Sequence, residues 1–357
     1  PIPFEFGAWR IAHREYALVS VRSQSGIVGR AWTLTRDGPV SAIVDAIVGP
    51  RYLGGLPGSA DALRDAVLAT NRPTLTSGVG LRALSLVDLA TWDLAARQRE
   101  RSIASLLGGV ELPMPATAVI GYPPSRDGGE IRVEVENLVR GGWRRFKLPA
   151  ADTAELTIRR VQAAAAAAGD GGSICLDGSW RFRDAATVAD LLLRLAVPLA
   201  WIEDVVAPGE LEPLVALRSL TTTPVAMGDE QGGPHFPDAL LAAGAVDVLR
   251  LDATCVGGLG PFVRASRRAT AAGKLVAPHM LGYLHAPILS AIGLAGSPIE
   301  WSVPGAGVEP FGESLPAPRI VEGMSQPLDG GPGFGCVVNP DWIADQRLDD
   351  PRGSLAW

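Results

Sequence analysis

The sequence is poor in cysteine and histidine. Its three cysteines, Cys175, Cys255 and Cys336, are widely separated along 357 residues and form no CxxC pair. This pattern argues against a disulfide framework and against a cysteine zinc site, and it favours a reducing, cytoplasmic location. The four histidines are few enough that the position of each one is informative.

An excess of basic charge is also missing. Lys and Arg number 32, Asp and Glu number 38, and the net charge is −6 with a pI near 5.4. Proteins that bind the phosphate backbone of nucleic acids usually carry a net positive charge, so nucleic acid is not expected as a partner. The first ten residues, PIPFEFGAWR, lack the basic segment and apolar run of a signal peptide.

One uncharged run is long enough to raise the question of a membrane. Residues 275–299 contain no Asp, Glu, Lys or Arg, and a helix of that length spans a bilayer. Pro278, Pro287 and Pro298 interrupt the run, and proline breaks a helix because it has no N–H to donate. We therefore predict a strand, a helix and a second strand here, and no contact with a membrane.

Apart from these scarce residue types, the composition is that of a globular protein. Hydrophobic residues make up 47% and charged residues 20%, which fits neither a disordered chain nor a coiled coil. The length predicts two domains, or one large barrel with an attachment.

From about Ala116 onward, short apolar runs alternate with amphipathic helical segments. Eight runs occur, at residues 116–121, 143–148, 173–178, 199–204, 223–229, 246–252, 274–279 and 298–301. Such alternation is typical of βαβ units with a parallel sheet. We predict an α/β TIM barrel of the (β/α)8 type, in the modified (β/α)7β form, over residues 116–316. A doubly wound sheet would need a glycine-rich turn after its first strand, where Tyr122, Pro123 and Pro124 stand instead.

The segments outside the barrel have a different pattern. Residues 1–115 predict an α+β capping domain, and the tail 317–357 is expected to pack back on it. In the capping domain, strands are expected at 16–22 and 29–35 and helices at 40–47, 60–70 and 85–97. In the barrel, two helices are expected to begin at the N-caps Asp152 and Asp184.

Polar residues stand where the predicted strands end, at intervals of about one βα unit. They are Lys147, Asp177, Glu203, Asp229, Asp252, His279 and Glu300. In a (β/α)8 barrel the carboxyl ends of the strands form one shared mouth that carries the active site. Seven polar residues in phase with the strands therefore predict a single polar cavity.

Converging carboxylates repel one another unless a cation neutralises them. Asp177, Glu203 and Asp229 follow three successive strands and can form a three-carboxylate site for a hard cation. Mg²⁺ prefers oxygen ligands of this kind and keeps other positions for water or substrate. Zinc is disfavoured because none of these strands carries His, and the chain has no HExxH motif.

Asp252 and His279 belong to the next two strands and are expected to be neighbours. A carboxylate beside an imidazole fixes its tautomer and raises its basicity, so the pair predicts a general base. His285 follows in the next helix, and we interpret it as support for the pair. His235 is interpreted as part of a surface loop.

These residues lie within motifs that resemble a known family. The chain is similar to the enolase superfamily, and within it to the mandelate racemase subgroup of the mandelate racemase/muconate lactonizing enzyme family, over nearly its whole length. The motifs are Trp92-Asp93-Leu94, LLGG at 106–109, WIED at 201–204, MGDE at 227–230, Gly257-Gly258, PHM at 278–280 and PGFG at 332–335.

The resemblance implies a role for each polar strand end. It implies that Asp177, Glu203 and Asp229 bind Mg²⁺. It implies that His279, held by Asp252, is the base. It also implies that Glu300 hydrogen-bonds the substrate carboxylate or its enolate and that Lys147 lies near that carboxylate. The muconate-lactonizing subgroup instead carries Lys at the sixth strand, so Asp252 argues against its activities.

The chain departs from the family at one important position. The family usually has Lys-x-Lys after the second strand, and its second Lys is the base on the opposite face of the substrate. Here Pro149 stands at that position and has no ionisable group. A racemase or epimerase needs two bases on opposite faces, whereas a dehydratase needs only one, with His279 serving in turn as base and acid. Ser179 replaces a residue that is often Asn.

We therefore predict a Mg²⁺-dependent acid-sugar dehydratase that forms a metal-stabilised enediolate and releases a 2-keto-3-deoxy acid. Two alternatives stay open: a racemase or epimerase that uses another base such as Lys147, and a catalytically silent relative that binds a metal or a sugar acid. A homo-oligomer is expected. Further substrate contacts are predicted, from loops that resemble the family's lids and from the strand ends, at Trp9, Arg10, His13, Ser179 and Glu230.

Overall fold

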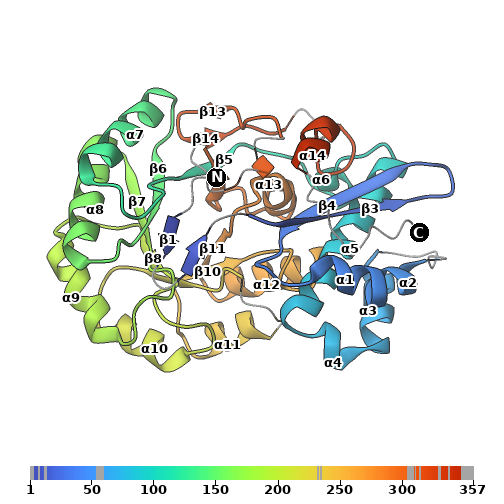
Figure 1. The fold of residues 1–357 in the computed structure, drawn as a ribbon, viewed down its shortest axis with the longest axis horizontal. Helices are drawn as coiled ribbons and strands as arrows, with labels where there is room; N and C mark the ends of the chain where they lie inside the picture. The colour runs from blue at the N-terminus through green and yellow to red at the C-terminus, as the bar shows by residue number, and fades with distance from the viewer. Residues whose placement is uncertain are drawn as a thin grey trace.

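The fold was analysed in a computed structural model of the chain. The structure describes residues 4–6, 9–11, 14–53, 60–230, 233, 235–303, 309, 311–312, 315–328, 331–336 and 338–346. Within these residues the chain forms a curled parallel sheet with helices on its outer side and an α+β region at one side of it (Figure 1).

Eight parallel strands build the curled sheet. They are β5 (Met114–Val119), β6 (Arg145–Pro149), β7 (Ser173–Asp177), β8 (Trp201–Glu203), β9 (Val225–Met227), β10 (Val248–Leu251), β11 (Leu275–Pro278) and β12 (Ile299–Ser302). Each strand from β5 to β10 pairs with the next one, and β12 pairs with β5 on the other side. The last two strands, β11 and β12, are in contact. The eight predicted runs are therefore the eight strands.

Seven helices connect these strands. They are α7 (Gly128–Arg140), α8 (Ala154–Ala168), α9 (Ala185–Leu195), α10 (Leu211–Leu220), α11 (Phe236–Ala242), α12 (Leu259–Ala271) and α13 (Gly282–Ala291). The order confirms the modified (β/α)7β barrel. Asp184 caps α9 as predicted, because its side chain accepts the N–H of Thr187. The prediction for α8 was wrong by one residue: Thr153, not Asp152, is its N-cap, and the Thr153 hydroxyl accepts the N–H of Leu156.

The N-terminal region has the predicted α+β character. Strands β3 (Tyr16–Arg22) and β4 (Val28–Leu34) form an antiparallel hairpin, and a short pair, β1 (Phe4–Phe6) and β2 (Trp9–Ile11), precedes it. The helical elements are α1 (Val40–Ile43), the π-helix η1 (Val44–Val48), α2 (Gly49–Tyr52), α3 (Ala60–Thr70), α4 (Arg72–Leu75), α5 (Gly78–Gln98) and α6 (Ile103–Leu106). Helix α5 begins at Gly78, seven residues before its predicted start at Ser85.

Two aspartates of α5 join distant parts of the chain. Asp88 accepts the N–H of Leu259 at 2.9 Å, at the start of barrel helix α12. Asp93 accepts the N–H groups of Arg30 and Phe334, each at 2.9 Å. The glycines of the GG and PGFG motifs make these approaches possible, since a Cβ on Gly258 would lie 2.1 Å from Asp88 Oδ2 and a Cβ on Gly333 would lie 2.0 Å from Asp93 Oδ1.

The C-terminal tail contacts both the capping region and the barrel. Gly333 forms a bridge with Ser102, whereas β14 (Met324–Ser325), which pairs with β13 (Ile320–Val321), pairs antiparallel with β5. Helix α14 (Pro340–Gln346) follows. The domain boundaries at 115 and 316 remain a prediction. None of the helices in the described ranges is both long and apolar enough to cross a membrane.

Side chains from five successive strands, β7 to β11, form an apolar layer inside the barrel. A compact apolar group in its interior consists of Cys175, Trp201, Ala226, Val248 and Ala277, all at most 3% exposed. Because side chains on a strand alternate between the two faces, the residue two positions further along points to the same side. The interior therefore continues with Asp177, Glu203, Arg250 and His279, and the apolar layer leads directly into a charged one.

Candidate active site

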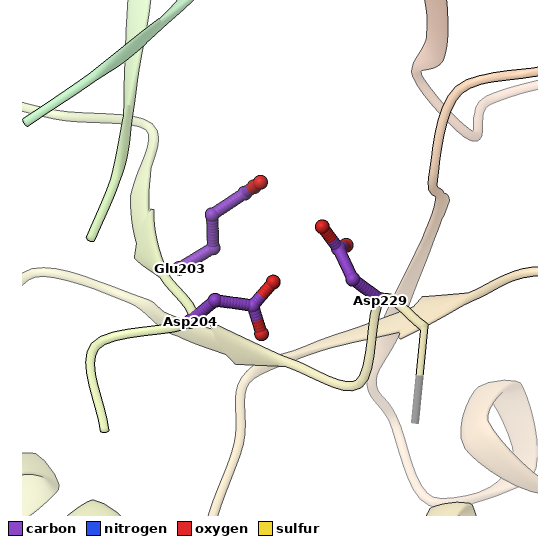
Figure 2. Close-up of side chains that lie close together, drawn as sticks. All are labelled: Glu203, Asp204 and Asp229. Carbon is purple, nitrogen blue, oxygen red and sulfur yellow. The ribbon is translucent and has the colours of Figure 1, made fainter. Parts of the chain in front are cut away.

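Three carboxylates meet in the barrel at the ends of β8 and β9. Glu203, Asp204 and Asp229 each offer an oxygen within 4.8 Å of the other two, and all three side chains are buried (Figure 2). In Figure 2 the carboxyl groups of Asp204 and Asp229 point toward one another. Buried carboxylates at this separation are stable together only with a proton or a cation between them.

The residues present fit a divalent metal ion. Oδ2 of Asp204 is buried and has no hydrogen-bond partner, so the group leaves an oxygen available inside the barrel. The donors are all carboxylate oxygens, which are the ligands that Mg²⁺ prefers. No other group of three such donors occurs within the described ranges.

Asp177, the third predicted metal ligand, lies outside this compact group. It is the register partner of Glu203 on the neighbouring strand, and it interacts electrostatically with Lys147 and Asp229. Ser179 holds it in place, because both the backbone N–H and the hydroxyl of Ser179 donate to Asp177 Oδ1, at 2.8 and 2.9 Å. The serine therefore orients the carboxylate, and its contact with substrate remains a prediction.

Lys147 is held between two carboxylates. Its Nζ atom lies 2.8 Å from Glu203 Oε1 and 2.7 Å from Glu300 Oε1. Burial alone would lower the pKa of Lys147, but Glu203 and Glu300 hold it well above its usual value. The lysine is therefore a fixed ammonium in this site, where it contacts both the candidate metal site and the last strand of the barrel.

The predicted pair of His279 and Asp252 is formed. His279 Nδ1 lies 3.3 Å from Asp252 Oδ2, while Oδ1 of Asp252 accepts the N–H and the hydroxyl of Thr254. Nε2 of His279 faces the metal carboxylates, 3.8 Å from Asp229 Oδ2. Burial opposes protonation, but Asp229, the hydrogen bond to Asp252 and Glu230 together raise the pKa of His279 to about 9.

His285 supports the pair through the backbone. Its Nε2 accepts the N–H of Ala253 at 3.1 Å, and its Nδ1 lies 2.9 Å from the carbonyl of Met280. A backbone N–H can only donate and a carbonyl can only accept, so His285 carries its proton on Nδ1. It ties the residue after Asp252 to the residue after His279, and thereby fixes the spacing of the pair.

Glu230 joins the barrel to the capping region. Arg36 donates to both of its oxygens at 2.7 Å, and Arg82 lies 3.3 Å from Oε2. Burial opposes ionisation, but Arg36, Arg82 and His279 lower the pKa of Glu230 to about 2. Glu230 Oε1 is 3.7 Å from Nδ1 of His279, so the carboxylate lies beside both the arginines and the proposed base, and its contact with substrate remains a prediction.

The other three predicted substrate contacts lie near the start of the chain. Trp9 and Arg10 lie on β2, but their side chains are not among those described, and His13 lies outside the described residues. His235 precedes α11 as its N-cap residue and makes no side-chain capping bond, which agrees with a loop position.

The sequence interpretation missed Arg250, which is fully buried on β10. Its Nε lies 2.7 Å from Asp229 Oδ1 and 3.4 Å from Glu203 Oε2, and its Nη2 lies 2.6 Å from Glu300 Oε1. The signal was present in the sequence: Arg250 stands two residues before Asp252 in a central strand, and must therefore point to the same inner face. Asp204 was missed because it directly follows Glu203.

Comparison with known proteins gives the family. Residues 130–342 match the family described as Enolase C-terminal domain-like, and residues 1–108 match the mandelate racemase/muconate lactonizing enzyme N-terminal domain. The chain belongs to the mandelate racemase/muconate lactonizing enzyme family of the enolase superfamily. The resemblance inferred from the motifs is thereby confirmed.

Family members with curated names differ in their reactions. D-galactarolactone cycloisomerase of Agrobacterium fabrum is 26% identical, with 98% of this chain and 96% of the relative covered. L-talarate/galactarate dehydratase of Salmonella typhimurium is 24% identical, with 77% and 70% covered. An N-succinyl-L-Arg/Lys racemase of Bacillus cereus is 21% identical, with 54% and 52% covered. The chain is therefore an enzyme of this family, and its particular reaction is not fixed by membership.

Solved structures of the same fold contain magnesium. An enolase from the alpha proteobacterium bal199, with bound magnesium, has a TM-score of 0.85 at 22% identity, with 96% and 94% of the two chains covered. L-talarate dehydratase from Polaromonas sp. JS666, complexed with magnesium and L-glucarate, has a TM-score of 0.80 at 23% identity, with 92% and 91% covered. These structures confirm the enolase fold with its capping region. The homo-oligomer and the cytoplasmic location remain predictions.

Proposed function

We propose that the protein is a Mg²⁺-dependent acid-sugar dehydratase. It would remove the proton α to a carboxylate and eliminate the β-hydroxyl, and the enol so formed would tautomerise to a 2-keto-3-deoxy acid. One observation carries the proposal: the His279–Asp252 pair is formed, whereas Pro149, which has no ionisable group, stands where the family usually carries its second base.

We assign the metal to Glu203, Asp229 and Asp177. Asp177 and Glu203 are register partners on adjacent parallel strands, so both side chains point into the barrel. Asp204 lies beside Asp229 and would orient it without itself binding the metal. Mg²⁺, when bound, supplies positive charge beside the substrate carboxylate while the α-proton is removed.

His279 would accept the α-proton at Nε2. Its Nδ1 atom faces Asp252, so Nε2 is the nitrogen directed at the carboxylate cluster where the substrate carboxylate would bind. The C–H electron pair then shifts toward the carboxylate, and the C–O bond to the β-hydroxyl breaks. His279, now protonated, would return that proton to the departing hydroxyl, which leaves as water.

Lys147 would bind the substrate carboxylate, and Glu300 would hold the lysine in place. Both are buried, and they are joined by an ion pair of 2.7 Å. A racemase would need Lys147 as the second base. The contacts of its ammonium with Glu203 and Glu300 disfavour the neutral amine that a base requires, and this supports elimination over racemisation.

A substrate screen in deuterium oxide tests the proposal. The purified protein with Mg²⁺ would be incubated with a library of acid sugars, with 2-hydroxy acids and with sugar-acid lactones, and the products followed by NMR. A dehydratase forms a 2-keto-3-deoxy acid with deuterium at C3. Exchange of the α-proton without loss of water would favour a racemase, consumption of lactones alone would favour a cycloisomerase, and no turnover would favour the silent relative.

A further inference from the structure

The charged layer of the barrel forms a closed ring of four side chains. Lys147, Glu203, Arg250 and Glu300 alternate in sign, and each contacts the next: the contacts are 2.8 Å from Lys147 to Glu203, 3.4 Å from Glu203 to Arg250, 2.6 Å from Arg250 to Glu300 and 2.7 Å from Glu300 to Lys147. The four residues come from alternate strands, β6, β8, β10 and β12. A layer of four side chains from alternate strands is the standard packing unit of this barrel, filled here by charges.

Arg250 is the cation of the ring that contacts two of the proposed metal ligands. Its Nε lies between Glu203 and Asp229, two of the three proposed ligands. Its Nη1 donates to the carbonyls of Ala277 and Pro278, at 3.1 and 3.3 Å. Five polar partners and complete burial fix the guanidinium, which stays charged because arginine does not lose its proton in proteins.

We infer that Arg250 is a built-in cation that positions Glu203, Asp229 and Glu300 in the metal-free protein and competes with the divalent ion for two of its ligands. Without Arg250, the barrel would bury these carboxylates with Lys147 as the remaining cation of the ring. Unpaired buried carboxylates are strongly destabilising. The guanidinium therefore stabilises the empty site and weakens metal binding by the same contacts.

The inference rests on the proposed metal site but not on the dehydration reaction. Because folding and binding are thermodynamically linked, a change that tightens Mg²⁺ binding increases the thermal stabilisation that Mg²⁺ produces. Arg250→Met is therefore expected to lower the midpoint of thermal unfolding in EDTA. Addition of Mg²⁺ is expected to raise that midpoint by more in Arg250→Met than in the wild type. Its dissociation constant for Mg²⁺ is expected to fall at least tenfold.

A second buried arginine provides the matched control. Arg160 is also fully buried, but its guanidinium donates to the carbonyls of Pro149 and Gly121 and contacts no metal carboxylate. Arg160→Met is expected to lower stability equally with and without Mg²⁺. Arg250→Lys, which keeps the charge, is expected to bind Mg²⁺ within threefold of the wild type.

Calorimetric titration with Mg²⁺ and thermal unfolding with and without EDTA test the inference. If the wild type binds no Mg²⁺, both the proposed metal site and the inference about Arg250 are overturned. If the wild type binds but Arg250→Met binds equally or more weakly, or is as stable as the wild type in EDTA, only the role of Arg250 is overturned. If Arg250→Met does not fold even with Mg²⁺, the double variant Arg250→Met/Glu300→Gln, which removes one positive and one negative charge, is tested by the same two measurements.

Discussion

The imidazole of His279 is fixed by Asp252, whose Oδ2 lies 3.3 Å from Nδ1 while its Oδ1 accepts two hydrogen bonds from Thr254. The carboxylate therefore cannot rotate away from the ring without breaking both bonds. This geometry leaves Nε2 directed at the carboxylate cluster. Nδ1 is therefore the nitrogen that Asp252 holds, and Nε2 is the nitrogen that would accept the proton.

Replacement of His279 by Asn should remove catalysis but keep the metal. A positioned acid/base contributes roughly 10²–10⁴-fold, and we expect His279→Asn to lower kcat by at least about 100-fold, because His279 is the proposed base. Mg²⁺ affinity, measured by titration calorimetry, should change little because the carboxylates remain. His235→Asn, outside the site, is the matched control. Turnover close to that of the wild type would remove His279 from the mechanism.

The pH dependence of the reaction should report the protonation of His279. A base acts in its neutral form, so kcat/KM should rise with pH and level off above the pKa of His279. That pKa is about 9 without a metal ion, and a metal ion bound to Asp229 opposes the largest interaction that raises it. We therefore expect the apparent pKa to lie below 9 at saturating Mg²⁺. A rate that declines between pH 6 and 8 contradicts this assignment.

Asp252→Asn should shift the same profile. The change removes a negative charge and an anionic hydrogen-bond partner from His279, and both raise its pKa. The rising limb should move to lower pH, while the plateau rate falls because the neutral amide holds the imidazole less strongly. Thr254→Val, which removes one hydroxyl bond to Asp252, serves as a milder comparison. An unmoved limb would show that another group titrates.

The order of strands could be predicted from sequence because each apolar run is short and ends in a polar residue. Every run from 116–121 to 298–301 overlaps a strand of the barrel. Helix α5 was predicted too short because its first turns carry Gly78 and Gly80, which ordinarily weaken a helix. Packing overrides that preference here, since a Cβ on Gly80 would lie 1.9 Å from the carbonyl oxygen of Thr74.

The site was predicted strand by strand, and this explains what was missed. A list of strand ends places Glu203 and Asp229 in one mouth, but it omits Arg250, which stands two residues before the strand-end residue Asp252. Arg250 and its ring of contacts depend on three-dimensional closure of the barrel. The arginines that hold Glu230 come from the capping region, and no local sequence pattern connects them to β9.

Two variants separate the roles of Asp177 and Asp204. If Asp177 is the third ligand, Asp177→Asn should weaken Mg²⁺ binding by tenfold or more, because a neutral amide is a poorer ligand than a carboxylate. Asp204→Asn should weaken it less, because Asp204 lies beside the proposed ligand Asp229 and is not itself a ligand in the proposed site. Titration calorimetry with Mg²⁺ alone measures both. The reverse order would assign the third position to Asp204, the residue that shares the compact group.

Asp88 should make stability depend on pH. It is fully buried on α5, its Oδ1 has no hydrogen-bond partner, and burial raises its pKa to about 7. The unfolded chain has the usual pKa of 3.8, so between these values the folded protein binds the proton more tightly. The stability contributed by protonated Asp88 is therefore present below about pH 4 and is lost as the pH rises through 7.

Asp88→Asn removes this ionisation and keeps an oxygen that can accept the N–H of Leu259. We expect its midpoint of unfolding to exceed that of the wild type by a few degrees at pH 8, a shift of about 1 kcal/mol or more, and the difference to shrink toward pH 5. Asp65→Asn, an exposed partner of the same Arg64, should keep the wild-type pH dependence because Asp88 is still present. Equal stability of Asp88→Asn and wild type at both pH values would show that the carboxyl group is ionised at no cost, through Arg64 at 4.0 Å.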